Sequence, residues 1–129
     1  MSEATKPQVG TVGWMDLTVE NAQDVRDFYG EVVGWSASDI DMGGYSDFCM
    51  NTPGAGTTVA GICHARGTNA GLPAQWLMYI TVEDLDASVD RVEALGGKVI
   101  AGPKDMGAQG RYCIIEDPAG AVAALYAPA

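Results

Sequence analysis

Four residues at matching positions of two strand-like stretches are candidates for ligand binding, and two of them are aromatic and one is acidic. Trp14 and Asp16 lie two residues apart in the first stretch, and Leu77 and Tyr79 lie two apart in the second. Side chains two apart in a strand share one face of the sheet. An aromatic wall beside a carboxylate can hold a planar or cationic small molecule. Two interpretations stay open with equal weight: these residues bind a ligand, or they fill the core of the fold.

Phe48 and Arg111 are two further candidates for ligand binding, at positions 63 residues apart (111 − 48). The guanidinium of Arg111 could anchor an anionic or carbonyl group of a ligand. It could also form an ion pair with Asp47 or Glu116, and we favour the ion pair. We rank Phe48 and Arg111 below the first four candidates because the sequence does not fix on which face of the sheet their side chains lie.

The chain offers no arrangement that predicts a nucleophile with a base beside it. Cys63 and His64 are neighbours in sequence, but alternation along a strand points their side chains apart. His64 is the only histidine, and we interpret it as a surface or hydrogen-bonded residue rather than a metal ligand, because metal sites need several converging ligands. The catalytic residues, if the protein is an enzyme, are not identified by the sequence.

The candidate strands belong to an internal repeat. Residues 13–21 resemble residues 76–84 at an offset of 63 (77 − 14), and Gly34 falls on Gly97 at the same offset. One offset held over most of half the chain indicates a duplication. We predict a flexible N-terminal arm at 1–10 and a single domain over 11–129. The domain contains a first module at about 11–64, a connector at 65–75 and a second module at about 76–127.

Each module is predicted to run β-α-β-β-β. Apolar residues at helical spacing indicate a helix over 22–33, with Asn21 as its cap and Gly34 as its stop. The second helix follows Asp84 as its cap and stops at Gly96-Gly97. The predicted strands are 12–19, 35–40, 45–50 and 57–63 in the first module, and 76–82, 98–101, 111–115 and 122–126 in the second, with a loop over 102–110 and a β-turn at Asp117-Pro118-Ala119-Gly120.

Composition limits the classes of partner. A length of 129 residues fits one domain with its own core, and a net charge of −10 argues against nucleic acid and against an anionic membrane surface. The acidic balance suits a cationic ligand, although it also serves solubility alone. The N-terminus lacks a signal-peptide pattern, and no apolar run is long enough to span a membrane. Cys49, Cys63 and Cys113 are interpreted as reduced, buried residues of a cytoplasmic protein.

Three stretches of the sequence carry a resemblance to a known family. Residues 25–35 contain Phe28-Tyr29 and end in Gly34-Trp35, residues 82–87 precede the second helix, and residues 117–120 form a late Asp-Pro-x-Gly turn. Together they resemble the vicinal oxygen chelate superfamily: glyoxalase I, bleomycin-resistance proteins and extradiol dioxygenases. The resemblance implies an α+β fold in which the mixed sheet of both modules curls into a cup, with the helices outside and the site inside. It also implies a homodimer.

The positions that hold metal in this superfamily are changed here. Its metal-dependent members place a histidine at the start of each first strand and a glutamate near the end of a fourth strand. The matching positions are Trp14, Leu77, Gly61 and Ala124, and none has a side chain that ligates a divalent ion. Asp16 is one carboxylate, which makes a poor metal site alone. We therefore expect no metal and no cofactor.

Three functions follow from this pattern, and we favour the first. It is a metal-free protein, like the bleomycin-resistance branch, that binds a small aromatic or cationic molecule in the cup. The second is a lyase, isomerase or dioxygenase-like enzyme with a non-standard site, in which a buried acid such as Asp16 does acid–base work. The third is a structural or regulatory dimer whose cup is filled by its own side chains.

Overall fold

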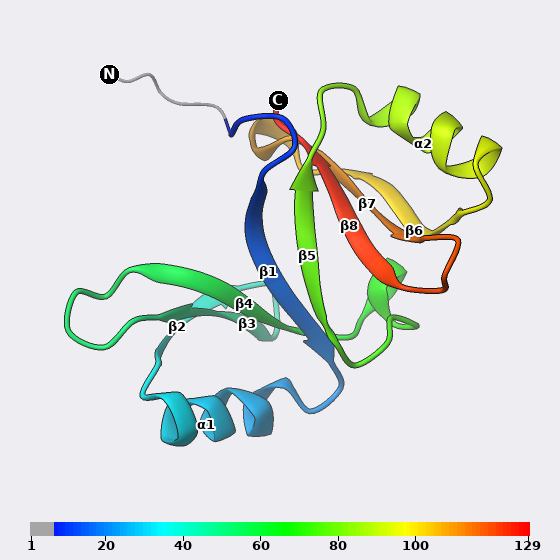
Figure 1. The fold of residues 1–129 in the computed structure, drawn as a ribbon. Coiled ribbons are helices and arrows are strands. Elements are labelled where there is room, and N and C mark those ends of the chain that lie inside the picture. The colour runs from blue at the N-terminus through cyan, green and yellow to red at the C-terminus, as the bar shows by residue number, and fades with distance from the viewer. Residues whose placement is uncertain (1–6) are drawn as a thin grey trace. The chain divides into compact units, whose positions relative to one another are not determined.

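The computed structural model describes residues 7–129, which form two compact units (Figure 1). The first unit is residues 14–76, and the second is residues 77–129 together with residues 7–13. We refer to them as the 14–76 unit and the 77–129 unit. The predicted flexible arm at 1–10 lies mostly outside the described residues. Of its last residues, Gly10 donates its N–H to the carbonyl oxygen of Thr81 at 2.8 Å.

The 14–76 unit is a mixed sheet with one long helix. Strand order is β2-β3-β4-β1, in which β1 pairs parallel with β4 and the other pairs are antiparallel. Its helix packs on one face of the sheet through Leu17, Val19, Ala22 and Ile62. Its elements are β1 (Val12–Val19), α1 (Ala22–Val33), β2 (Ser36–Asp41), β3 (Ser46–Asn51), β4 (Thr58–His64) and the 3-10 turn η1 (Gly67–Asn69).

The 77–129 unit repeats this plan. Strand order is β5-β8-β7-β6, with β5 parallel to β8 and the remaining pairs antiparallel. Its helix begins at a buried Leu85 and packs near Cys113 and Leu125. Its elements are β5 (Trp76–Thr81), α2 (Leu85–Ala94), β6 (Lys98–Asp105), the 3-10 turn η2 (Gly107–Gln109), β7 (Arg111–Glu116) and β8 (Val122–Ala127).

The strand register matches the offset found in the sequence. Asp16 stands opposite Gly61 in the β1–β4 pair, and Tyr79 stands opposite Ala124 in the β5–β8 pair. The offset is 63 for both strands (79 − 16 and 124 − 61). The predicted α+β class and the repeated β-α-β-β-β order are therefore confirmed.

Two local predictions are wrong. The loop predicted over 102–110 is in part strand, because β6 continues to Asp105. Pro103 is tolerated there since β6 is an edge strand, and register shifts near Ala101 absorb the irregular backbone. The predicted cap at Asn21 makes no side-chain hydrogen bond to α1, whereas the predicted cap at Asp84 accepts one from the N–H of Ala87 at 3.1 Å.

Other turn predictions are confirmed. Gly34 ends α1 in the left-handed region at φ 86° and donates its N–H to the carbonyl of Gly30. The carboxylate of Asp117 accepts hydrogen bonds from the N–H groups of Ala119 and Ala121, which holds the turn before β8. Neither α1 nor α2, nor any other helix within residues 7–129, has the length and apolarity needed to cross a membrane.

The two helix caps give a matched test of local stability. We expect Asp84→Ala to lower the free energy of unfolding by about 1 kcal/mol, because the first turn of α2 loses its side-chain acceptor. Asn21→Ala should change it by only a few tenths, since that side chain makes no cap bond. Urea denaturation of both variants checks this, and an equal loss would contradict the assignment of the caps.

Candidate functional site

The centre of the candidate site is a hydrogen-bonded pair on β1. The indole Nε1–H of Trp14 donates to Oδ1 of Asp16 at 3.1 Å, so the two side chains share a face as their spacing predicted. Asp16 is only 8% exposed, while Trp14 is partly exposed. Leu17 and Val19, on the opposite face of the strand, pack in the core beneath α1. The pair therefore lies on the face of β1 opposite to that core.

A cysteine from β4 completes the surroundings of Asp16. The Sγ atom of Cys63 lies 3.4 and 3.6 Å from the two carboxylate oxygens and donates to them as a thiol. Burial raises the pKa of Asp16 to about 6, and the nearby carboxyl of Asp47 adds to the rise against the opposing effect of the two hydrogen bonds. Burial, with the charges of Asp16 and Asp47, also raises the pKa of Cys63 far above its ordinary value. Cys63 is thus a thiol donor here and no nucleophile.

Gly61 makes room for this arrangement. It stands opposite Asp16 in the β1–β4 register. A Cβ atom at Gly61 would overlap Oδ1 of Asp16 and would lie 3.1 Å from the ring of Trp14. In the 77–129 unit the corresponding position is Ala124, which is fully buried beside Tyr79. The missing side chain at Gly61 is therefore a steric requirement of the Trp14–Asp16 pair.

His64 is hydrogen-bonded to Asp47, the carboxyl that also acts on Asp16 and Cys63. Oδ1 of Asp47 accepts from the backbone N–H of His64 at 2.8 Å and lies 3.3 Å from its Nδ1. The rings of Tyr45 and Phe48 lie 5.5 and 6.0 Å from the imidazole. The guanidinium of Arg66 stacks 3.8 Å from the ring centroid of Tyr45. The prediction that His64 is hydrogen-bonded is confirmed, and its bonds anchor the end of β4.

The other sequence candidates lie in different surroundings. Leu77 is buried, and the ring of Tyr79 is 6.0 Å from that of Tyr112. Phe48 packs in the core beneath α1, with the guanidinium of Arg26 at 4.6 Å from its centroid. Trp14 and Asp16 are thus the two candidates that the structure brings into direct contact within one unit.

Arg111 has a different partner from those predicted. Its two terminal nitrogens donate to the carboxylate of Asp86, at 3.1 and 3.2 Å, which lies on α2. The proposed ion pairs with Asp47 or Glu116 are wrong, because β7 presents Arg111 toward the first turn of the helix. The hydrogen bonds and charge of Arg111 hold the pKa of Asp86 below its usual value.

The residues present do not fit the divalent metal of the metal-dependent superfamily members. Across residues 7–129, no group of three His, Cys, Asp or Glu side chains is placed to hold a metal ion. Asp16 is the acid nearest the family's ligand positions, and its oxygens accept hydrogen bonds from the indole of Trp14 and the thiol of Cys63. Trp14 and Gly61 stand at two of the family's ligand positions, and neither has a side chain that ligates a divalent ion.

Sequence reasoning missed two participants in the site. Cys63 follows Gly61 by two residues, so strand alternation alone could have placed it on the face of Asp16. Asp47 could not have been found in this way, because its position depends on how β3 pairs with β4. The three cysteines predicted to be reduced are free, with Cys113 buried and the other two partly so.

The described residues form two β-α-β-β-β units, and the first strand of the 14–76 unit carries the buried acid Asp16. The model of the Glyoxalase/Bleomycin resistance protein/Dioxygenase superfamily matches residues 11–125. The chain belongs to this superfamily, as its sequence resemblance indicated.

Curated relatives carry two kinds of name. The chain is 33% identical over 127 residues to a putative glyoxylase, CFP32, of Mycobacterium bovis, covering 98% of this chain and 49% of the relative. It is also 33% identical over 132 residues to the anthracycline biosynthesis protein DnrV of Streptomyces peucetius, covering 91% of this chain and 46% of the relative. The chain thus spans about half the length of both relatives.

Solved structures share the fold at low sequence identity. Methylmalonyl-CoA epimerase from Mycobacterium tuberculosis has a TM-score of 0.56 at 17% identity, covering 97% of this chain and 93% of that chain. A variant of the Streptomyces coelicolor epimerase has a TM-score of 0.57 at 13% identity, covering 95% and 96%. At such identities the likeness concerns the fold alone.

The steric role of Gly61 gives a first test of the site. We expect Gly61→Ala to lower the free energy of unfolding by about 1–3 kcal/mol, the usual cost of overpacking. Gly13→Ala is the matched control, because a Cβ there meets only Oγ1 of Thr81, at 4.0 Å. Chemical denaturation compares the two. Equal stability of both variants would show that Asp16 and Trp14 do not need the space above Gly61.

The raised pKa of Asp16 gives a second test. An acid with its pKa raised from 3.8 to about 6 on folding favours the folded state below pH 3.8, and this contribution is lost as pH rises through about 6. A shift of this size corresponds to about 3 kcal/mol. We expect Asp16→Asn to remove a fall in stability of this order between those pH values. Parallel stability–pH profiles of the two proteins would contradict the raised pKa.

Proposed function

We propose that this protein binds a small aromatic molecule carrying a basic group, and that Trp14 and Asp16 recognise it without a metal ion. One observation carries the proposal. Burial and the charge of Asp47 raise the pKa of the buried Asp16 carboxyl, hydrogen bonds from an indole and a thiol lower it, and no cation is among these causes. A protonated amine on a ligand would supply the opposite charge that a buried carboxylate lacks.

Trp14 supplies the second half of the recognition. Its ring is partly exposed, while its N–H is held by Asp16. An indole fixed in this way offers a flat apolar surface at little cost in side-chain entropy, and a cation near its face gains further attraction. The protein's net charge of −10 also favours the approach of a cation.

The relatives support the small-molecule class without deciding its identity. One has a name that places it in the biosynthesis of anthracyclines, which are small organic molecules, and another is named a putative glyoxylase. We further propose, from the family resemblance, that the protein works as a homodimer, and from its free cysteines, that it works in the cytoplasm. Sedimentation at micromolar concentration tests the dimer.

A second candidate function rests on the same carboxyl. A pKa of about 6 lets Asp16 exchange a proton near neutral pH, as a general acid or base must. The protein would then be an acid–base enzyme of the superfamily with a non-standard site. Turnover of the bound compound that disappears in Asp16→Asn, while binding persists, would favour this function over simple binding.

The binding proposal is tested with pairs of compounds that differ only in an amine. We expect a fused-ring aromatic amine to bind more tightly than its neutral analogue, measured by titration calorimetry. Asp16→Asn should reduce that preference by about tenfold, since the charge partner is removed. Asp39→Asn, an exposed acid on β2 with the same change in net charge, is the control and should keep the preference.

Trp14→Ala separates binding from packing. We expect it to weaken binding by about tenfold, as loss of an aromatic contact at a binding site does, with a smaller effect on the free energy of unfolding. Equal losses of binding and stability would place Trp14 in the core and contradict its role in recognition.

A further inference from the structure

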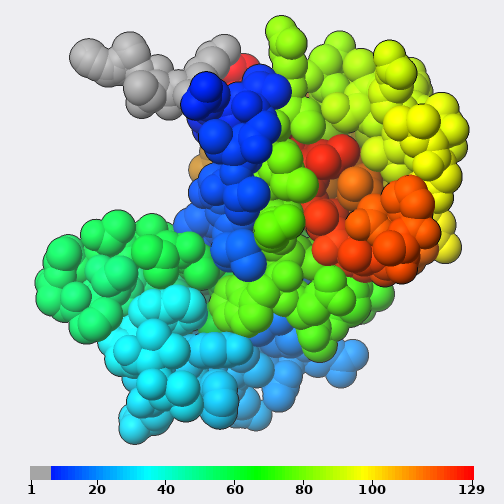
Figure 2. Space-filling view, viewed as in Figure 1, coloured from blue at the N-terminus to red at the C-terminus, as the bar shows by residue number. Residues whose placement is uncertain are grey.

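An open apolar groove lies in the 77–129 unit, away from Asp16 and its partners. It has a volume of about 650 Å³, within the range of small-molecule sites. Residues of α2, β7 and β8 line it, and Figure 2 shows β8 in red at the bottom of this hollow, with β5 and α2 on its sides. The apolar side chains that line it are Val9, Val82, Val92, Leu95, Ile115 and Leu125.

The internal repeat shows what the fold can place at this position. In the 14–76 unit, the rings of Tyr29, Trp35 and Trp76 pack on the same part of the core, with centroids 5.4 to 6.1 Å apart. The indole of Trp76 also donates to the hydroxyl of Tyr29 at 3.0 Å. At the offset of 63, the equivalent residues in the 77–129 unit are Val92, Lys98 and Gly13.

Of these three residues, Val92 lines the groove, so a smaller side chain stands there in place of the Tyr29 ring. Val19 and Ile62 are buried in the 14–76 unit, where the aromatic cluster borders them. Their equivalents Val82 and Leu125 line the groove, where Val82 is partly exposed and Leu125 is buried, and Leu95 at its border is 70% exposed. The same backbone plan thus holds three rings in one unit and leaves room for rings in the other.

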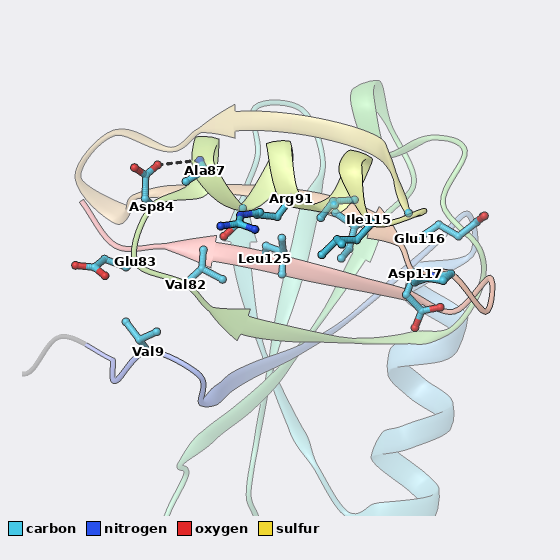
Figure 3. Close-up of a pocket in the computed structure, with 15 residues that line it drawn as sticks. Val9, Val82, Glu83, Asp84, Ala87, Arg91, Ile115, Glu116, Asp117 and Leu125 are labelled. Atoms are coloured by element: carbon cyan, nitrogen blue, oxygen red, sulfur yellow. Dashed lines mark hydrogen bonds between the residues drawn. The ribbon is translucent and has the colours of Figure 1, made fainter.

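The rim of the groove is acidic. Glu83 and Asp84 lie at one end and Glu116 and Asp117 at the other, with Arg91 between them (Figure 3). Lys98 offsets one of these charges, since its Nζ lies 4.0 Å from Glu116. Four carboxylates against these two cations leave an excess of negative charge around an apolar floor.

We propose that this groove is a second binding site, which takes a planar aromatic cation. The apolar floor accepts the ring system beside Val92, at the position that Tyr29 occupies in the other unit. The acidic rim favours a positive charge at the edge of the ring, where the carboxylates remain in contact with water. Neither Trp14 nor Asp16 lines this groove, so an experiment can support or contradict the second site separately from the function proposed above.

The test uses proflavine, a planar tricyclic cation, titrated into Asp16→Asn protein so that the first site is weakened. We expect saturable binding, with backbone amide NMR shifts centred on Val82, Val92 and Leu125. Leu95→Arg should weaken binding by about tenfold or more, because it brings a like charge to the groove from an exposed position. Val32→Arg is the matched control on α1, at the equivalent, 64% exposed residue, and should leave the affinity unchanged.

A second variant fills the groove instead of charging it. Val92→Tyr copies the residue of the 14–76 unit, and we expect it to reduce proflavine binding while the protein stays folded by circular dichroism. Equal weakening by Leu95→Arg and Val32→Arg would overturn the site. Tighter binding of the anionic dye anilinonaphthalene sulfonate than of proflavine would overturn the cationic class. A dimer that Leu95→Arg alone dissociates, without loss of dye binding, would instead make the groove a contact between copies.

Discussion

The candidate site depends on one constraint, which is that the carboxyl group of Asp16 is buried. A carboxyl that is 8% exposed must be hydrogen-bonded or neutral, and here the indole of Trp14 and the thiol of Cys63 provide the hydrogen bonds. Both donors are neutral, so they satisfy the oxygens without cancelling the charge. Burial raises the pKa of Asp16 against the lowering effect of both hydrogen bonds. The proposed function rests on this carboxyl, whose charge a proton or a ligand cation would neutralise.

Duplication gave the chain two copies of one backbone plan, and the copies differ in how they fill it. Position 61 is Gly beneath a buried acid, whereas its equivalent, Ala124, stands opposite Tyr79. Beneath α1 an aromatic cluster covers the core, while smaller residues beneath α2 leave a groove. Each unit thus has its own candidate binding surface, and a ligand that suits one has no reason to suit the other.

Much of this could be predicted from sequence because it depends on spacing alone. The constant offset gave the two-module plan, and alternation placed Trp14 and Asp16 on one face, apart from Leu17 and Val19. Features that depend on how the elements pack on one another could not be predicted from spacing. The sequence predicted the wrong partners for Arg111 because Asp86 reaches it only through the packing of α2 on β7.

The groove in the 77–129 unit could not be predicted from the sequence either. Val92 lines the groove where the equivalent residue of the other unit is the larger Tyr29, and this difference has meaning only once the packing of α1 is known. The continuation of β6 through Pro103 was missed for a related reason. A proline predicts a loop, but an edge strand needs hydrogen bonds on one side only.

The close approach of Asp16 to Gly61 also limits how the protein could evolve. In metal-dependent relatives a glutamate is expected near position 61, but any side chain introduced there would collide with Asp16 and crowd Trp14. A larger side chain at position 61 therefore fits this strand pair only if Asp16 moves or is replaced, so we expect residues 16 and 61 to change together.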